Sequence, residues 1–377
     1  MNVVRPVWAE IDLGAVRHNV AVLAERVRPA RLCAVVKAFA YGHGPVEVSR
    51  AALAGGASWL AVALVEEGAV LRDAGITAPI LLLSEPPAAA MAEVVGLGLT
   101  PTLYTADGLT ALNGVIADPA FAGRLPVAVH VKVDTGMHRV GATHDGAVKL
   151  ALAVEESPQL SLEGLWTHFA VADAPDDDFT SVQHGRFRAA VDELATAGIR
   201  PPLLHCCNSA GALAHPACHG DLVRCGIAVY GVAPSPALVG AAPLRPALSL
   251  RARVSFVKEV EAGDALSYGL RYRLARRSVV ATVPIGYADG VPWRLGVTGG
   301  EVLVGGRRRP LAGSVTMDQI LVDCGDDASV AVGDEVVLVG TQGDEQIDAW
   351  EWAERVGTIA YDVLTGIGPR VPRVYVD

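Results

Sequence analysis

One lysine stands at the end of a buried apolar run, where an amine can act as a nucleophile. The run Ala34-Val35-Val36 is followed at once by Lys37, and then by Tyr41, Gly42 and Gly44. This pattern predicts a strand that presents the amine at its carboxyl end, with glycines that let the backbone approach a ligand closely. Loss of hydration favours the neutral amine, which is the form that makes Schiff bases. A single lysine at a strand end more often extends to solvent, so this interpretation depends on the rest of the chain.

Polar residues lie at or soon after the ends of four other valine- and leucine-rich runs. They are Arg139 within Lys132–Gly141, His168, Asn208-Ser209, and Arg224 with Gly226-Ile227. The carboxyl ends of parallel barrel strands meet at one rim, which is where barrel enzymes place their active sites. The last two segments also suit phosphate, through backbone N–H groups and a small hydroxyl. Asn208-Ser209 is equally compatible with an ordinary helix N-cap.

The elements that must position these residues alternate along the first two thirds of the chain. Alanine-rich helical stretches, such as Val46–Ala54 and Asp145–Val154, separate eight short apolar runs. Eight strands alternating with helices predict a (β/α)8 TIM-type barrel, which we assign to residues 1–240. The predicted strands are Leu32–Val36, Trp59–Leu64, Ile80–Leu83, Thr100–Tyr104, Val127–Val133, Leu162–Thr167, Leu203–Cys206 and Leu222–Arg224.

A different pattern begins after the proline-rich segment Pro234–Pro246. Strand-like runs separated by Gly-Asp and Gly-Gly turns predict a C-terminal all-β domain over residues 241–377, with one helix at Asp348–Val356. The expected strands are Leu248–Val260, Ser278–Pro284, Glu301–Val304, Gln319–Asp323 and Glu335–Val339. The basic triplet Arg307-Arg308-Arg309 is interpreted as a solvated loop.

Composition excludes several classes of partner. A net charge of −10 argues against nucleic acid, and 51% hydrophobic with 19% charged residues indicates a large core. We expect no membrane span, because prolines interrupt the uncharged stretch from Cys225 to Leu244, and no secretory signal is recognisable at the start. Six cysteines do not suggest a disulfide framework, so we expect a cytoplasmic protein. The His and Cys residues between His205 and His219 lack zinc-ligand spacing, so no metal site is predicted.

Four segments together resemble the alanine racemases: Lys37–Gly44, Lys132–Gly141, Val223–Gly231 and Thr358–Arg373. The resemblance runs from Val7 to Arg373. It implies pyridoxal 5'-phosphate as cofactor, an amino-acid substrate, a homodimer with shared active sites, and D-alanine for peptidoglycan synthesis. Lys37 would carry the cofactor and serve as one base, and Tyr268 of the other subunit would be the second base. Two bases are needed because racemisation removes a proton from one face and returns it to the other.

The resemblance also implies roles for the other candidates. Arg224 would face the pyridine nitrogen and, with His168, would favour the ionised form of Tyr268. Arg139 would contact the cofactor and the substrate carboxylate, and Lys132 matches a lysine that some relatives carry as a carbamate. The residues implied for the phosphate are Tyr41, Asn208, Ser209, Gly226, Ile227 and Tyr361. Those implied for substrate and entrance are Met317, by its backbone N–H, and Tyr287.

Three positions depart from the pattern of the family. Phe39 replaces asparagine, His138 replaces glycine and Thr316 replaces cysteine, which leaves substrate range and rate open. A serine or broad-specificity racemase and a non-catalytic pyridoxal-phosphate-binding barrel remain alternatives. A decarboxylase is a third, although Arg224 argues against it because decarboxylation benefits from a stronger electron sink.

Overall fold

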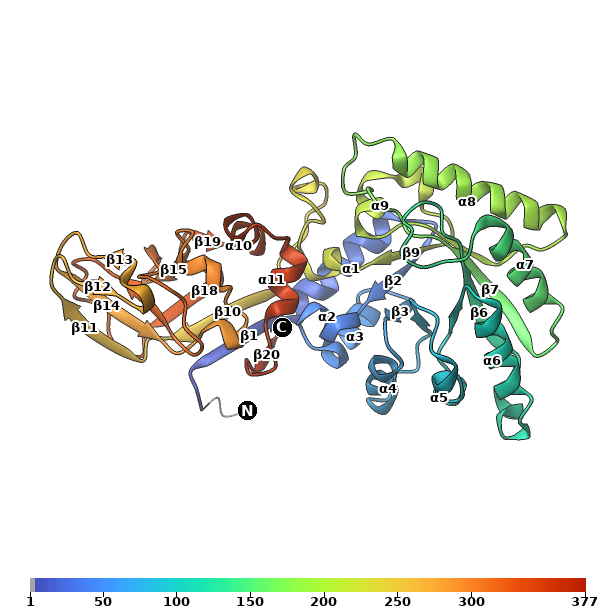
Figure 1. Ribbon diagram of the computed structural model, residues 1–377, viewed down its shortest axis with the longest axis horizontal. Coiled ribbons are helices and arrows are strands. Elements are labelled where there is room, and N and C mark those ends of the chain that lie inside the picture. Colours follow the sequence, from blue (N-terminus) through green and yellow to red (C-terminus); the bar gives the residue numbers. More distant parts are fainter. Residues whose placement is uncertain (1–3) are drawn as a thin grey trace. The chain divides into compact units, whose positions relative to one another are not determined.

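The computed structural model describes residues 4–377 and divides into two compact units. One contains Ala15–Ala40 and Pro45–Arg245, and the other contains Tyr41–Gly44, Pro246–Asp377 and the segment that ends at Gly14. Figure 1 labels the elements of both.

The first unit is a closed barrel of eight parallel strands. Two four-stranded sheets, in the orders β4-β3-β2-β9 and β5-β6-β7-β8, are joined on one side by a parallel bridge between Leu81 and Thr100. They are joined on the other side by the Arg224 N–H, which donates to the Cys207 carbonyl over 3.0 Å. The strands are β2 Arg31–Val35, β3 Trp59–Val62, β4 Ile80–Leu82, β5 Thr102–Leu103, β6 Val127–Lys132, β7 Leu160–Trp166, β8 Leu203–His205 and β9 Leu222–Cys225. The eight strands predicted from the sequence are therefore confirmed.

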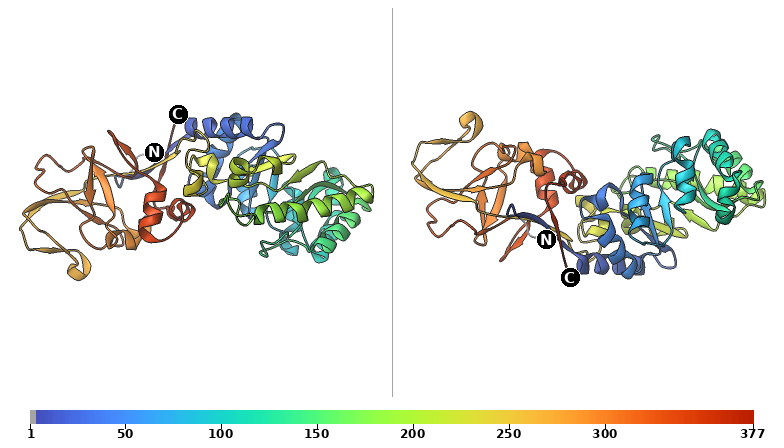
Figure 2. Two further views of the ribbon diagram at one scale, coloured as in Figure 1. Left: turned by 90° about the horizontal axis from the view of Figure 1, so that it is seen from above. Right: turned by 90° about the horizontal axis from the view of Figure 1, so that it is seen from below.

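Helices flank the barrel strands, as both views of Figure 2 show for this unit. They are α1 Leu13–Arg26, α3 Pro45–Ala54, α4 Val65–Asp73, α5 Met91–Gly96, α6 Ala106–Ile116, α7 His144–Glu155, α8 Phe179–Thr196 and α9 Ser209–Ala214. The strands are apolar along nearly their whole length because the interior of the barrel and the helices cover both faces.

The second unit is built from a seven-stranded sheet, a three-stranded sheet and a hairpin. The large sheet contains β1 Val7–Asp12, β10 Leu248–Arg253, β15 Glu301–Val304, β16 Arg307–Pro310, β18 Glu335–Gln342, β19 Glu345–Ile347 and β20 Arg373–Val376. The small sheet contains β11 Phe256–Val260, β14 Ser278–Val283 and β17 Ile320–Asp323, and the hairpin joins β12 Ala265–Leu266 to β13 Tyr272–Arg273. Two helices, α10 Ala349–Val356 and α11 Ala360–Gly366, complete the unit.

Three features of this unit differ from the sequence prediction. Strand β1 was placed with the barrel, but it pairs antiparallel with β10 and parallel with β20, so it belongs to the β unit. The run Leu248–Val260 is two strands in different sheets, and helix α11 was not predicted. The two units meet in sequence at Arg245 and Pro246, five residues beyond the expected boundary.

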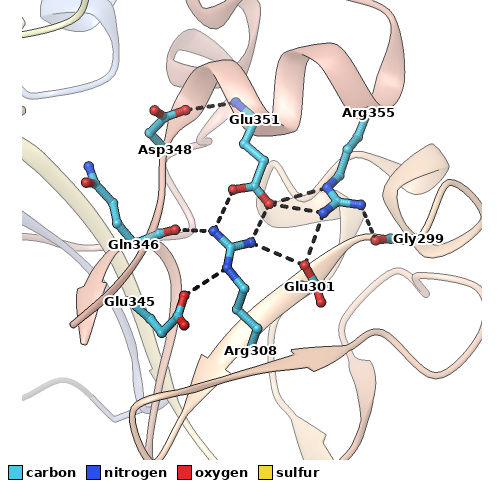
Figure 3. Close-up of polar contacts among 8 residues, drawn as sticks. All are labelled: Gly299, Glu301, Arg308, Glu345, Gln346, Asp348, Glu351 and Arg355. Carbon is cyan, nitrogen blue, oxygen red and sulfur yellow. Dashed lines mark hydrogen bonds and ion pairs between the residues drawn. The ribbon is translucent and has the colours of Figure 1, made fainter. Parts of the chain in front are cut away.

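The basic triplet is also different from its prediction, because it forms strand β16 instead of a solvated loop. Arg308 is two-thirds shielded and forms ion pairs with Glu301, Glu345 and Glu351, at 3.2, 3.0 and 2.8 Å (Figure 3). Arg355 pairs with two of the same carboxylates. The three acids come from β15, β19 and α10, so the network connects three elements of the unit.

Candidate active site

Lys37 begins an unusual turn directly after β2. The segment labelled α2, Lys37–Tyr41, is left-handed, with φ between 51° and 56° at the four residues from Ala38 to Tyr41. Such backbone costs about 1–2 kcal/mol per residue and concentrates at functional sites. Glu67 anchors the turn, because one oxygen accepts from the Ala38 N–H at 2.6 Å and the other from the Ala63 N–H at 2.8 Å.

The surroundings of Lys37 favour its neutral form. Burial lowers the pKa of its amine, and the nearby Arg139 cation lowers it further, while Glu67 has the opposite effect. A lysine with a lowered pKa presents a larger fraction of the free amine, which can attack a carbonyl carbon or accept a proton.

Arg224, on β9, is a buried cation with neutral partners. It is 2% exposed and donates to Nδ1 of His205 at 2.7 Å and to the Thr167 carbonyl at 2.9 Å. Its guanidinium lies 4.4 Å from the ring centroid of Trp166. Among residues 4–377 it has no carboxylate partner, and its hydrogen bonds run from the two terminal nitrogens, to His205, Thr167, His168 and Cys206. One donor therefore remains for an acceptor that the chain itself does not supply.

His168 and Lys132 lie in the same cationic environment. Burial and then Arg224 hold the pKa of His168 well below its usual range, and Nδ1 of His168 is 3.3 Å from a terminal nitrogen of Arg224. Lys132 is 4% exposed, and its amine lies 4.2 Å from the ring centroid of Trp166. Burial, followed by the charges of Arg224 and Arg139, lowers the pKa of Lys132 to about 7. Both side chains are therefore largely neutral above that pH.

Arg139 is exposed at the end of a loop that Asp134 organises. One Asp134 oxygen accepts from the N–H groups of Gly136 and His138, each at 3.0 Å. His138 has a φ of 55°, so the turn expected of a glycine is retained with a histidine in the left-handed region.

The loops after β8 and β9 are bonded to each other. The Asn208 side chain caps α9 by accepting from the Gly211 N–H at 2.9 Å, as the N-cap interpretation predicts. The Ser209 hydroxyl accepts from the Gly226 N–H at 2.9 Å. The Gly226 N–H is thus already engaged within the protein, whereas Ile227 begins the short turn Ile227–Tyr230. The Gly226 N–H is therefore not available to donate a hydrogen bond to a phosphate at this site.

The remaining candidates lie in the β unit. Tyr41 and Tyr361 are neighbours, with ring centroids 6.2 Å apart. The Gly42 carbonyl accepts from Arg373 at 2.8 Å, and a methyl group at Gly42 would lie 2.3 Å from the Leu364 carbonyl oxygen. The segment from Tyr41 is therefore packed closely against α11.

Tyr268 lies in a strained turn and is 77% exposed. Ser267, Gly269 and Leu270 all have positive φ, and the Tyr268 carbonyl accepts from the Ser314 hydroxyl at 3.0 Å. Tyr268 lines a hollow of about 440 Å³ together with Ser267, Gly269, Thr316, Gln319 and Leu321.

Met317 and Tyr287 belong to the same region of the β unit, and both are about half exposed. The Tyr287 N–H donates to the Thr316 carbonyl at 3.0 Å, and the Ala288 N–H donates to the Met317 carbonyl at 3.1 Å. The sequence-predicted residues thus form two groups: Lys37, Arg139, His168, Asn208, Ser209, Arg224, Gly226 and Ile227 in the barrel, and Tyr41, Tyr268, Tyr287, Met317 and Tyr361 in the β unit.

Sequence reasoning missed the residues that support these groups. Glu67, Asp134 and His205 had not been singled out for the roles they play, although an acid at the third position of helix α4 was a usable signal for Glu67. All six cysteines are buried and unpaired, and no cluster of three or more potential metal ligands occurs in the part of the chain that the structure describes. In the same part, no helix combines the length and apolarity needed to cross a membrane.

Comparison with known proteins decides the family. Residues 11–234 match the family described as alanine racemase, N-terminal domain, and residues 247–375 match alanine racemase, C-terminal domain. The chain is 47% identical to an alanine racemase of Symbiobacterium thermophilum over 98% of this chain and 97% of that one. The chain belongs to the alanine racemase family. The resemblance drawn from the sequence is confirmed, and so is the combination of a barrel with a smaller C-terminal domain.

Solved structures agree with this assignment. An alanine racemase from Streptomyces coelicolor A3(2) has a TM-score of 0.93 at 40% identity, over 99% of both chains. A histidine racemase from Leuconostoc mesenteroides subsp. sake has a TM-score of 0.90 at 29% identity, over 100% of this chain and 99% of that one. These relatives support the assignment of the chain as a racemase and do not favour a non-catalytic barrel.

Proposed function

We propose that this alanine racemase interconverts L- and D-alanine with two bases, Lys37 of one subunit and Tyr268 of the partner subunit. The observation that carries the proposal is the buried guanidinium of Arg224, surrounded by neutral acceptors with one donor left over. A guanidinium only donates hydrogen bonds, so a heteroaromatic nitrogen that faces it must accept and remain unprotonated.

The barrel residues fit pyridoxal 5'-phosphate, which we infer to be the cofactor. The Lys37 amine, whose pKa is lowered, matches the aldehyde of that molecule. The Nε of Arg224 matches its ring nitrogen, and the Ser209 hydroxyl matches its phosphate. When bound, the cofactor supplies an electron-withdrawing ring that stabilises negative charge on the α-carbon of the amino acid. The residues that would hold it are Lys37, Tyr41, Arg139, His168, Asn208, Ser209, Arg224, Ile227 and Tyr361, while Gly226, whose N–H is bonded to the Ser209 hydroxyl, would position that hydroxyl.

The charge state of Arg224 favours racemisation over other reactions of an α-carbanion. An acid at this place would protonate the facing nitrogen and strengthen electron withdrawal, whereas Arg224 keeps it weak. With the cofactor held there, Arg224 would leave negative charge near the α-carbon and so would favour return of a proton to it.

The two bases differ in how the protein prepares them. Burial and Arg139 keep the Lys37 amine available as a proton acceptor. Tyr268 is exposed on a strained turn, as expected of a residue that reaches the active site of another subunit. The Arg224 cation, bonded to the neutral His168 ring at 3.3 Å, is the candidate that would support this phenol as a base.

Substrate recognition would use a cation and a backbone donor. Arg139 would meet the carboxylate, Met317 of the partner subunit would offer a backbone N–H, and Tyr287 would line the approach. Lys132 suits carbamate formation, in which its neutral amine adds to carbon dioxide and releases one proton. The Lys132 amine lies in the field of the basic groups of Arg224, Arg139 and Lys37, which lower its pKa. The same positive charges would stabilise a negatively charged carbamate at this position.

A complementation experiment tests the shared site. Lys37→Ala and Tyr268→Phe homodimers should each be nearly inactive, because each lacks one base in both sites. Mixing and reassociating them should place one intact site in each hybrid, which gives about a quarter of the native activity for random pairing of equal amounts. Recovery of no activity from verified hybrids would contradict a site built from two subunits.

The substrate range follows from the pocket. A methyl and a hydroxymethyl group differ little in binding free energy. A protein of closely similar structure is named a histidine racemase, so the fold alone does not set the substrate. We propose alanine as the main substrate, and faster turnover of L-serine than of L-alanine would overturn that choice.

We also infer a cytoplasmic homodimer that supplies D-alanine for bacterial peptidoglycan. The six unpaired cysteines are consistent with a reducing compartment. Depletion in the producing bacterium should create a requirement for added D-alanine; growth unchanged without it would count against this role.

A further inference from the structure

A row of three polar side chains continues from Arg224 into the barrel and ends on a carboxylate. Nδ1 of His205, on β8, lies 2.7 Å from a terminal nitrogen of Arg224. Nε2 of His205 lies 2.9 Å from Nδ1 of His130 on β6. Nε2 of His130 lies 3.4 Å from Oε2 of Glu163 on β7. Both histidines are completely buried.

The last contact of this row joins Nε2 of His130 to Oε2 of Glu163. Nε2 of His130 and Oε2 of Glu163 are shielded from solvent and have no hydrogen-bond partner among residues 4–377. A buried donor or acceptor without a partner costs about 1–3 kcal/mol, so two such atoms at this separation are best explained as partners.

The backbone is shaped to bring Glu163 to this place. The pairing of β6 with β7 shifts between Val129 and His130, which pair with Leu162 and Gly164, so Glu163 is the extra residue of a β-bulge. A bulge redirects a side chain that regular alternation would send elsewhere. Gly164 makes room for the neighbouring ring, because a methyl group there would lie 2.5 Å from Nδ1 of His130.

The direction of every hydrogen bond follows from the arginine. Arg224 can only donate, so Nδ1 of His205 must accept and its proton must be on Nε2. That proton is donated to Nδ1 of His130, whose own proton must therefore be on Nε2, the nitrogen that lies 3.4 Å from the Glu163 carboxylate. Burial is the main cause that lowers the pKa of both histidines, so both rings are neutral and each carries a single proton.

We propose that Glu163, His130 and His205 are positioning residues that form a one-way hydrogen-bond chain on Arg224, with the Glu163 carboxylate as the remote counter-ion of the guanidinium. The chain holds the arginine in one orientation, with Nε turned toward the acceptor it serves. It also places a negative charge at the far end of a pathway that contains no other carboxylate. Trp166, stacked on His205 with ring centroids 5.5 Å apart, fixes the plane of that ring.

Neutron diffraction from a perdeuterated crystal of the holoenzyme tests the chain directly. It should show deuterium on Nε2 and none on Nδ1 of both His205 and His130. Deuterium on Nδ1 of either ring, or on both nitrogens of one, would overturn the proposal. The positioning of Arg224 matters for catalysis only within the proposed function, but the proton positions do not depend on which amino acid is turned over. Failure of the chain and failure of the proposed function are thus distinguishable.

Substitution of the terminal acid tests the consequence. Glu163→Leu should lower kcat about tenfold with little change in KM, because in the proposed function Arg224 would contact the cofactor and not the substrate side chain. Glu163→Gln keeps an acceptor for His130 but removes the charge, so its loss should be smaller. Glu193→Gln is the matched control, because Glu193 pairs with His144 at 2.7 Å outside the chain and its loss should leave kcat unchanged.

A second readout separates positioning from folding. If Glu163 merely stabilised the barrel, both Glu163 variants would unfold more easily while retaining native kcat, which would contradict the proposal. Gly164→Ala should displace the His130 ring and reproduce the loss of kcat while leaving Glu163 itself in place.

Discussion

Lys132 provides a quantitative test of how the site handles charge. Its pKa falls from 10.5 to about 7 because the amine is buried beside other cations. A pKa lower by about 3.5 corresponds to about 5 kcal/mol of preference for the neutral amine in the folded state.

The sign sets the pH dependence of stability. Below pH 7 both folded and unfolded chains carry the proton, and the folded state bears the full cost of a buried charge. As the pH rises above 7 the folded state releases the proton while the unfolded state keeps it, so stability increases up to about pH 10.5. Between pH 6 and pH 9 this contribution amounts to about 3 kcal/mol.

Lys132→Met removes the titrating group while keeping most of its volume. The free energy of unfolding of the variant minus that of the native enzyme should be about 3 kcal/mol larger at pH 6 than at pH 9, so the variant gains relative stability at low pH. Urea denaturation of the holoenzymes in buffers free of carbon dioxide measures this difference. The buried histidines are present in both proteins, so their main contributions cancel.

Lys149→Met, at an exposed position of α7, is the control and should show no such difference. An equal pH dependence in native and Lys132→Met proteins would refute the argument that burial and neighbouring cations depress this amine. Added bicarbonate at pH 9 should stabilise the native enzyme alone if Lys132 forms a carbamate.

Other predictions concern backbone and ion pairs. Gly42→Ala, with a φ of 85° and a carbonyl oxygen 2.3 Å from the new methyl group, should lower the free energy of unfolding by about 2–4 kcal/mol. Gly114→Ala, in open space within α6, should instead raise it by about 0.5–1 kcal/mol. Arg308→Met should cost about 1–2 kcal/mol, discounted for its partial exposure, whereas Arg307→Met on the same strand should cost almost nothing. Phe39→Asn should be stabilising by up to about 1 kcal/mol, since asparagine tolerates a φ of 56° better than phenylalanine. Denaturant titrations measure all five, and a destabilised Phe39→Asn would show that the ring makes contacts that outweigh the strain.

Local patterns predicted the barrel because each of its strands is a short apolar run bounded by turns. Val7–Asp12 has the same local pattern, and only its pairing with β10 and β20 reveals that it belongs to the β unit. The left-handed turn from Ala38 to Tyr41 contains no glycine, so its sequence gave no sign of positive φ.

Residues that act through distant partners were the hardest to predict. Arg308 was expected in solvent because its three acidic partners lie on other elements of the β unit. His205 and His130 are 75 positions apart, and Glu163 beside them is the extra residue of a bulge between β6 and β7. Site residues at strand ends could be predicted because the barrel brings the carboxyl ends of its strands together. The positions of His130, His205 and Glu163 inside the barrel depend on the pairing register of the strands, which the sequence does not reveal.

The central claim is that Lys37 and Tyr268 serve opposite faces of the α-carbon. It is tested most directly by exchange of the α-hydrogen in D₂O with Tyr268→Phe, followed by proton NMR for each enantiomer of alanine. One enantiomer should exchange at a near-native rate with retention, and the other should exchange about 10³-fold more slowly. Tyr272→Phe, which removes a hydroxyl bonded to Asp323 at 2.9 Å in the same unit, should exchange both enantiomers normally. Equal exchange of both enantiomers by Tyr268→Phe, or undiminished racemisation, would contradict the two-base account.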